Sequence, residues 1–353
     1  MSAAVDIPRL LGWRRPAPWA LAALLAVLAA LPLVWRNQYV IELAITTLIW
    51  ATLNQSWNLQ LGVGGVWNFA QLAIFAVGGY AAAILTLRAG LDPWLSLPVG
   101  GLAAAGVAVL IGIPTLRLRG IYAALLTFSF GEVIRLLVIS DESGLTGGTF
   151  GLSGVPGLGF ERLDPVAAQR AYYWAALALT VLTAVGVAAF IRSPLGLALT
   201  ALRDAPGYAA ARGVSPLRMQ VVTFAWSAFI AGVAGAFYAQ YFHVISPSVM
   251  GLAPMSLFVA MLVVGGLGTF SGPLVGTVLI MVVGEWLRDT EQLRLVIVGA
   301  ILLTVVVLAP RGLVPAAAAG WRRASRWLAE EPDASEAPGE RAGVGAGSDP
   351  EGG

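Results

Sequence analysis

RSPLGLALTALRDAPGYAAARGVSPLRM, residues 192–219, is the polar stretch that decides how this chain is organised, because long apolar runs lie on both sides of it. It carries four arginines and one aspartate and is rich in alanine. A basic loop between two membrane spans is typical of the cytoplasmic side. The pattern predicts a short helix interrupted at Pro206–Gly207 and a second short helix over Tyr208–Arg212 that ends at Gly213.

Two interpretations of this loop stay open on the residues alone. A short helix that projects at the membrane surface can seat in a groove of a soluble partner. Alternatively, the arginines only set the orientation of the protein and bind anionic lipid headgroups. The loop composition does not choose between these two roles.

The composition around the loop is that of an integral membrane protein. The chain is 58% hydrophobic and 11% charged, whereas soluble domains carry roughly 25% charged residues. The alternating pattern of a membrane β-barrel is absent from the sequence, so helices are the remaining way to satisfy the backbone in hydrocarbon. We therefore expect an all-α, polytopic membrane protein.

Apolar segments of about 17–25 residues mark the expected spans. They predict about ten transmembrane helices, near residues 18–35, 39–57, 69–87, 95–116, 120–139, 171–191, 218–241, 254–269, 272–287 and 293–309. The pair over 254–287 is ambiguous, because the glycine-rich stretch Gly265–Pro273 could lie between two helices or inside one long or broken helix.

The arginines predict the orientation. With an even number of spans both termini lie on one side, and that side collects twice as many of the 21 basic residues as the other. Both termini and the 192–218 loop are therefore expected in the cytoplasm, and the long connection 140–170 outside. The expected domains are a cytoplasmic segment 1–17, a permease domain 18–310 and a cytoplasmic tail 311–353 that is disordered after about residue 328.

Several kinds of chemistry are excluded by residue type. The chain has no cysteine and its 21 basic residues are all arginine, so it has neither a thiolate nucleophile nor the lysine that a Walker A loop needs. It has one histidine, and no Ser/His or acid/His pair shares a face. We expect no catalytic, cofactor-binding or metal-binding residue in this chain, and therefore no enzyme.

Polar residues inside the expected spans are candidates for a translocation path. Asn68 and Gln71 are three residues apart and would share one face of a helix, and Glu132 and Arg135 can pair in the same way. For Glu132, a static ion pair that locks two helices is favoured over a role as a proton carrier. Two roles are possible for a further set of residues: they could line the path, or they could pack helices together. The set is Asn54, Asn58, Thr127 and the glycines Gly265, Gly266 and Gly268.

Five motifs, in this order, carry a resemblance to a known family. They are GVGGVWNFAQLAIFAVGGYAAA (62–83), LRLRGIYAALLTFSFGEVIRLL (116–137), LTGGTFGLSGVP (145–156), AGVAGAFYAQYFHVISPSVMG (231–251) and VVGGLGTFSGPLVGT (263–277). Over roughly residues 40–310 the chain resembles the permease subunits of branched-chain amino acid ABC importers, in particular the LivM-like subunit.

The resemblance implies a multi-pass protein of the bacterial inner membrane, in contact with lipid and with no nucleic-acid partner. It implies that the chain pairs with a LivH-like second permease, with two ATP-binding subunits that hold ATP and Mg, and with a periplasmic or extracellular substrate-binding protein. The substrate class would be branched-chain or related hydrophobic amino acids, although sibling systems for urea and short amides share these motifs. An alternative from a different class of protein is an ion-coupled secondary transporter. It would need clustered intramembrane acids to bind the coupling ion, and Glu42, Glu132 and Glu285 form no cluster in the sequence.

In this family the cytoplasmic loop before the expected seventh span docks on an ATP-binding subunit. The family pattern there is approximately acid-x-x-Ala-Ala-Glu-Ala-Leu-Gly, and Pro206 and Ala210 stand where acids are common. The resemblance, together with the basic character of the loop, assigns coupling to Arg203, Asp204, Ala209, Ala211, Arg212 and Gly213.

Overall fold

The structure is a computed structural model that describes residues 28, 30–32, 37–115, 118, 120–287, 291–310, 312–317 and 319–320. Most of the span predicted at 18–35 and the tail beyond residue 320 lie outside the described residues, so the predictions for them are not tested. The chain divides into two units, residues 317–353 and the larger unit of residues 1–316.

Helices make up nearly all of this unit. The larger ones are α3 (Gln38–Asn58), α4 (Gln71–Ala89), α5 (Pro93–Thr115), α6 (Ile121–Ile139), α7 (Pro165–Arg192), α10 (Pro216–Phe242), α11 (Leu252–Gly265), α12 (Gly272–Trp286) and α13 (Glu291–Leu308). The shorter ones are α8 (Pro194–Asp204), α9 (Pro206–Ala211), a π-helical turn over Leu59–Val63 and 3-10 turns at Gly148–Phe150, Phe160–Arg162 and Pro247–Met250. Two strands of two residues, β1 (Leu152–Ser153) and β2 (Val244–Ile245), pair antiparallel.

Five of these helices, α4, α5, α6, α7 and α10, are long and apolar enough to cross a membrane. By contrast, α11 and α12 have 14 and 15 residues, which is about 21–23 Å of helix and less than the roughly 30 Å hydrocarbon core. The described residues therefore confirm an all-α, multi-pass protein. The count of ten spans and the cytoplasmic termini stay predictions.

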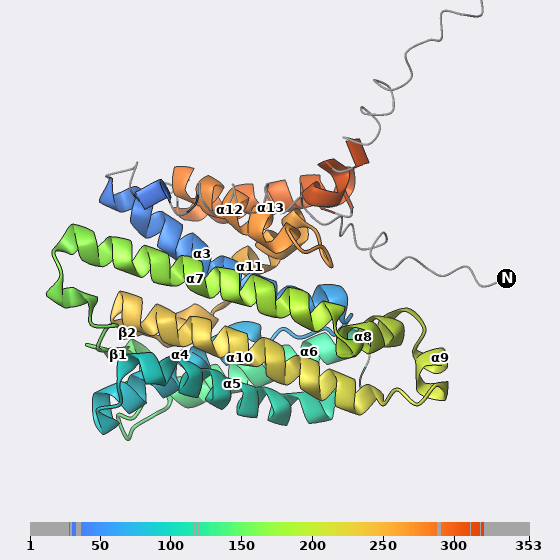
Figure 1. The fold of residues 1–353 in the computed structure, drawn as a ribbon, viewed down its shortest axis with the longest axis horizontal. Helices are drawn as coiled ribbons and strands as arrows, with labels where there is room; N and C mark the ends of the chain where they lie inside the picture. Colours follow the sequence, from blue (N-terminus) through green and yellow to red (C-terminus); the bar gives the residue numbers. More distant parts are fainter. Residues whose placement is uncertain are drawn as a thin grey trace, which may run out of the picture. The chain divides into compact units, whose positions relative to one another are not determined.

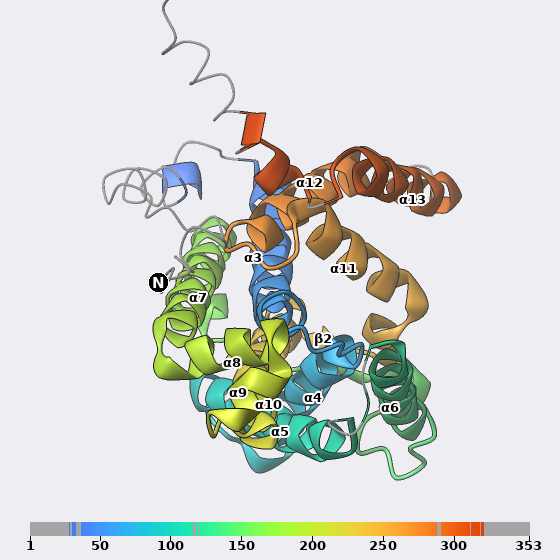
Figure 2. The ribbon, with the colours of Figure 1, turned by 90° about the vertical axis from the view of Figure 1, so that its right-hand side faces the viewer.

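The long helix α10 lies at the centre of one group of helices. Viewed along the helices, α4, α5, α3 and α7 lie around it (Figure 2). The close approach depends on glycine: a Cβ added to Gly78 of α4 would collide with the backbone of Gly232, and one added to Gly235 would collide with the carbonyl of Phe75. Small residues allow this because packing, and not the exclusion of water, drives helices together in lipid.

A second group contains α11, α12 and α13: α11 and α12 contact α3, and α13 packs against α11 and α12. The ambiguous stretch 254–287 forms two helices joined by a turn over residues 266–271. The turn requires glycine at Gly266 and Gly268, whose φ angles of 115° and 74° are disfavoured for other residues. One hydrogen bond from Asn54 Nδ2 to Thr277 Oγ1, of 2.9 Å, ties α12 to α3.

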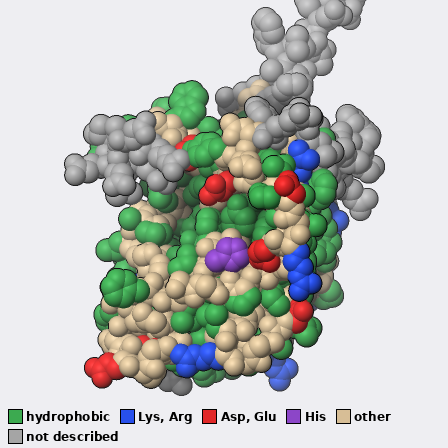
Figure 3. Space-filling view, turned by 90° about the vertical axis from the view of Figure 1, so that its left-hand side faces the viewer, with side chains coloured by type: hydrophobic (Ala, Val, Ile, Leu, Met, Phe, Trp, Pro, Cys, Tyr) green, Lys and Arg blue, Asp and Glu red, His purple; other side chains and the backbone are tan. Residues whose placement is uncertain are grey.

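The connections gather at two ends of the helices (Figure 1). The β1–β2 pair joins the segment after α6 to the segment after α10, and we call this the β end. The helices α8 and α9 lie at the other end. Figure 3 looks onto the β end, where acidic and basic side chains are scattered among apolar ones. Residues 140–170 and 192–218 therefore lie at opposite ends, as the predicted alternation of spans requires.

The packing of α10 generates a stability prediction with a matched control. Gly232→Ala should lower the free energy of unfolding by about 1–3 kcal/mol, because the new methyl group would meet Ala104 Cβ and the backbone of Gly100 and Gly101. Gly106→Ala makes the same change in α5 where no atom lies within 4 Å, and it should be neutral or stabilising by about 0.5–1 kcal/mol. Unfolding of the purified protein in detergent measures both, and equal effects would contradict the close α4–α5–α10 contact.

Candidate functional site

A network of uncharged polar side chains occupies the interior between α3, α4 and α10. Its members are at most 1% exposed: Ser56, Gln60, Asn68, Gln71 and Ser227. Gln71 Nε2 donates to Ser56 Oγ at 3.0 Å and to Ser227 Oγ at 3.3 Å. Asn68 Nδ2 donates to Gln60 Oε1 at 2.7 Å and to Gln71 Oε1 at 3.2 Å. In this conformation the network closes on itself, while Gln60 Nε2 is left without a partner.

Asn68 does not lie on a helix, which corrects the prediction that it shares a helical face with Gln71. Its Oδ1 accepts a hydrogen bond from the amide of Ala70 at 2.9 Å, a local turn that competes with helix, and α4 begins only at Gln71. Non-helical backbone at membrane depth is tolerated where other groups satisfy it. Here Trp57 Nε1 donates to the Asn68 carbonyl at 2.5 Å, and Thr127 Oγ1 accepts from the amide of Phe69 at 2.9 Å.

Asn58 fastens the end of α3 to the turn between α11 and α12. Its Nδ2 donates to the Thr269 carbonyl at 2.8 Å, and its Oδ1 accepts from the Gly268 amide at 2.9 Å. Beside this bridge the backbones of Gly62 and Gly268 touch, because a Cβ on Gly62 would collide with the amide nitrogen of Gly268. Among the predicted glycines, Gly265 packs in the same region, against the backbone of Gly272.

The helix α8 lies on the other side of the same segment. Leu199 is buried among apolar residues of the π-helical turn and α7, and it touches Gly64. Arg203 Nη1 donates to the Gly62 carbonyl at 3.1 Å. The carboxylate of Asp204 accepts from Arg203 Nε at 2.8 Å and thereby fixes the guanidinium in place.

The helix α9 follows directly and has the two-helix arrangement that the sequence predicts. Ala209 is buried, whereas Tyr208 is 82% exposed and Ala211 and Arg212 are exposed. Gly213 ends the helix with a φ of 86°, and the amide of Val214 donates back to the Ala209 carbonyl at 3.1 Å, a common way to end a helix. The helix α9 therefore has an exposed face, and it directly follows α8, which is fixed to residues 59–65 by Leu199 and Arg203.

These contacts form one continuous connection. Residues 194–213, 59–65 and 266–272 lie far apart in the sequence and meet through Arg203, Gly62, Asn58 and Gly268. Gly62 thus contacts both Arg203 of α8 and Gly268 of the turn between α11 and α12. Sequence analysis identified Arg203 and Gly268 but not the contact that each makes with Gly62. Nothing in a single sequence links residues more than 140 positions apart.

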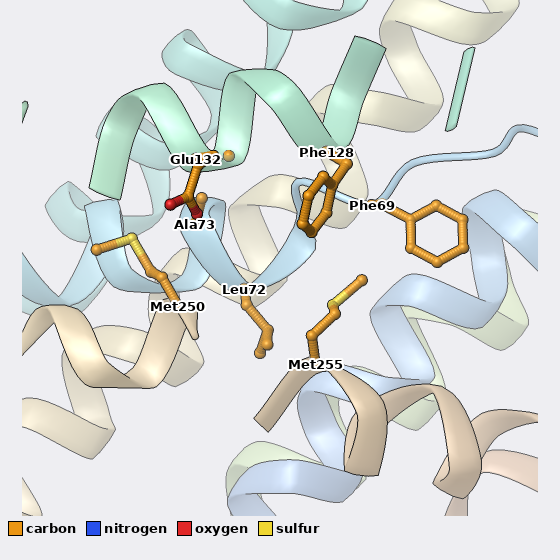
Figure 4. Close-up of a pocket in the computed structure, with 8 residues that line it drawn as sticks. Phe69, Leu72, Ala73, Phe128, Glu132, Met250 and Met255 are labelled. Carbon is orange, nitrogen blue, oxygen red and sulfur yellow. The ribbon is translucent and has the colours of Figure 1, made fainter. Parts of the chain in front are cut away.

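Glu132 and Arg135 lie on α6 and form the predicted ion pair. Arg135 Nε donates to both carboxylate oxygens at 3.0 Å. Both residues belong to one helix, so the expectation of a pair that locks two helices is wrong. Figure 4 shows Phe128 pointing from α6 toward Met255 of α11, and Glu132 pointing from α6 toward Ala73 of α4 and Met250; these residues all line one cleft.

At the β end, the carboxylate of Asp141 organises the turn that follows α6. It accepts hydrogen bonds from Ser143 Oγ at 2.5 Å and from the amide and Oγ1 of Thr146 at 2.5 and 2.8 Å. These bonds favour the ionised form and hold the pKa of Asp141 well below its ordinary value of 3.8. Their contribution is therefore present above about pH 4 and is lost as the pH falls further.

Within the residues that the structure describes, no group of three or more His, Asp or Glu side chains gathers where a metal ion could bind. The site consists instead of a buried polar network, a non-helical segment before α4 and a surface loop that contacts the neighbouring segment 59–65. Interrupted helices packed around buried polar groups are typical of membrane transport proteins.

The chain belongs to the family of permease components of branched-chain amino acid transport systems, whose family model matches residues 39–306. It is 31% identical to the high-affinity branched-chain amino acid transport system permease protein LivM of Escherichia coli K12, over 84% of this chain and 74% of that protein. The LivM protein of Salmonella typhimurium is 32% identical over the same shares. The LivH permease of Escherichia coli K12 is 25% identical over 75% of this chain and 91% of its own length. No solved structure matches the chain significantly, and the resemblance drawn from the motifs is confirmed.

The bridge made by Asn58 generates a second prediction. Asn58→Ala should lower the free energy of unfolding by about 2–3 kcal/mol, because it leaves the partly buried amide of Gly268 and carbonyl of Thr269 without these partners. Asn54→Ala, one turn earlier on α3, should cost about 1 kcal/mol, since Thr277 keeps its own bond to the Pro273 carbonyl. Denaturant unfolding in detergent compares the two, and a larger loss for Asn54→Ala would contradict the bridge.

Proposed function

We propose that this chain is the membrane-spanning permease subunit of an ATP-driven importer, and that it forms the translocation path for branched-chain or related hydrophobic amino acids. Membership of the permease family supports the transport role. The observation that carries the proposed mechanism is the connection from α8 through Arg203 and Gly62 to the turn at Gly268.

The proposed assembly contains a LivH-like second permease, two ATP-binding subunits that hold ATP and Mg, and a substrate-binding protein outside a bacterial inner membrane. Similarity to both LivM and LivH proteins supports a pair of related permeases. The chain supplies no lysine for a phosphate-binding loop, so ATP hydrolysis belongs to the partner subunits. The cytoplasm would lie at the α8–α9 end, and the binding protein would dock at the β end.

In the proposed cycle, α9 docks on an ATP-binding subunit through its exposed face, which includes Tyr208 and Arg212. Closure of the ATP-binding subunits then moves α8, and Arg203 passes this movement to residues 59–65. Because Gly62 touches Gly268, the α11–α12 turn moves as well. Such a displacement would convert the path between outward-open and inward-open states.

Uptake by the reconstituted complex tests the proposed function. Labelled leucine and labelled urea are offered to proteoliposomes with and without ATP and the binding protein. Leucine uptake that needs both supports the proposal, and uptake of urea alone would assign the chain to an importer of urea or short amides. Uptake driven by an ion gradient with this chain alone would overturn the proposal in favour of a secondary transporter.

The two roles assigned to the loop make separate predictions. Tyr208→Ala with Arg212→Ala should release the ATP-binding subunits from the purified complex, because both side chains lie on the docking face. Arg203→Ala should leave the complex assembled but lower ATP-driven uptake about tenfold or more, since the link to Gly62 is lost.

Co-purification measures assembly, and uptake per ATP hydrolysed measures coupling. Arg218→Ala, an exposed arginine at the start of α10, is the control for loss of positive charge on the loop and should change neither. If Arg218→Ala and Arg203→Ala have the same effect, the arginines act through lipid headgroups and the coupling role is wrong.

A further inference from the structure

A groove of about 340 Å³ lies between α6 and α11. Its lining is almost wholly apolar and comes from four parts of the chain: Phe69, Phe128, Leu252, Met255, Ser256, Val259 and Leu302. Ligand pockets in proteins are roughly 300–1,000 Å³, so a groove of this size can hold a small ligand such as leucine. The groove is therefore large enough for a ligand and apolar enough to favour an aliphatic side chain.

The groove adjoins the cleft that Glu132 lines. The cleft shares Phe69, Phe128 and Met255 with the groove and is itself narrow, about 10 Å³, which is room for about one water. Glu132 lies one helical turn after Phe128 on α6, so the two side chains share a face. Figure 4 shows the ring of Phe128 directed toward Met255 and the carboxylate of Glu132 directed toward Ala73 and Met250. The cleft next to the apolar groove thus has a charged group in its lining, and Arg135 is the ion-pair partner of that group.

The ion pair beside the groove is only partly used. Arg135 and Glu132 are 29% and 39% exposed, and the bonds between them involve Nε and Nη2 of the guanidinium. A guanidinium has five N–H donors and a carboxylate about four acceptor positions. Each partner therefore retains capacity for a further charge-assisted bond: Glu132 for a cation and Arg135 for an anion.

The pair lies within an apolar helix, where a charge that faces lipid is costly. Glu132 and Arg135 lie within α6, one of the helices long and apolar enough to span the membrane. Charged residues inside a span are costly and face a bundle interior or a wet cavity, where they mark a substrate path. In the assembled transporter this face of α6 is consequently expected to border water or ligand.

We propose that the groove and the ion pair together form a binding site for an aliphatic amino acid in its zwitterionic form. The α-ammonium group binds the carboxylate of Glu132, the α-carboxylate binds Arg135, and the side chain extends past Phe128 between Met255 and Val259. An amino acid carries both charges on one carbon, and the pair presents the two complementary charges side by side. The inference rests on the proposed function and assigns its recognition of substrate within the membrane to named residues.

The site also sets an order of entry. Glu132 lies nearer the β end of α6 than Phe128, because α6 runs toward Ile139 at that end. The charged head of the amino acid would therefore lie toward the β end and its aliphatic side chain toward the α8–α9 end. A substrate released at the β end would enter with its side chain leading.

Charge variants in the complete complex test the site. Glu132→Gln keeps the size of the side chain but removes its charge, and it should lower leucine uptake at subsaturating substrate about tenfold or more. The doubly substituted chain with Glu132→Arg and Arg135→Glu keeps an ion pair within α6 but reverses it, so it should fold and still lose uptake. Glu142→Gln, an exposed carboxylate beyond the same helix, is the matched control and should import normally.

A direct readout comes from a leucine analogue that carries a photoreactive diazirine in its side chain. During ATP-driven uptake by the wild-type complex, irradiation should label Phe128, Met255 or Val259, and mass spectrometry of the peptides locates the label. The reversed pair should abolish that label while ATP hydrolysis stimulated by the loaded binding protein stays near the wild-type rate.

The outcomes separate this inference from the proposed function. If the wild-type complex imports leucine but both charge variants import as well as Glu142→Gln, the pair is structural and the inference is wrong. Label that falls only on the second permease or on lipid shows that the groove is covered by one of them, which also overturns it. If the wild-type complex shows no ATP-driven leucine uptake, the proposed function itself fails.

Discussion

The side-chain amide of Asn58 is the interaction on which the arrangement of this protein depends. It joins the last residue of α3 to the turn between α11 and α12. Without it the amide of Gly268 and the carbonyl of Thr269 would lose these partners, and a buried polar group left unsatisfied costs about 1–3 kcal/mol. An amide suits this role because its Nδ2 donates while its Oδ1 accepts, whereas an ionised carboxylate only accepts and could not bind the Thr269 carbonyl.

The same constraint explains why the interior is built from amides and hydroxyls. Gln71, Ser56 and Ser227 satisfy one another across three helices, which avoids the desolvation cost of a charge. The described ion pair of α6 lies instead at a partly exposed position beside a groove. The two kinds of polar group therefore differ in their surroundings: the neutral ones bind one another in the interior, and the charged pair is the one to which we assign a ligand.

Much of the fold could be predicted from the lengths of the apolar segments alone. The expected segments 39–57, 95–116 and 120–139 lie within a few residues of α3, α5 and α6, because hydrophobic runs of this length have few alternatives. The errors fall where a side chain competes with the helix. Asn68 was assigned to a helix that begins three residues later, since its local turn leaves no signal in hydropathy. Of the candidate site, Arg203 and Glu132 were identifiable by charge. Their partners were not, because the Gly62 carbonyl and the groove around Met255 exist only in the folded chain.

The segment 64–70, which has no regular secondary structure, connects the two parts of the site. At one end Gly65 lies against Arg203, with Cγ of the arginine 2.8 Å from where a Cβ would be. At the other end Phe69 lines both the groove and the cleft next to Glu132. Between these two ends the segment is held by the bond from the Val66 amide to the Gln60 carbonyl and by the side chains of Asn68 and Thr127. A helix at this position would be tied by its own repeating hydrogen bonds, whereas this irregular segment is held at a few points. Under the proposed function, a shift of α8 would reach the ring of Phe69 through this segment without unfolding a helix.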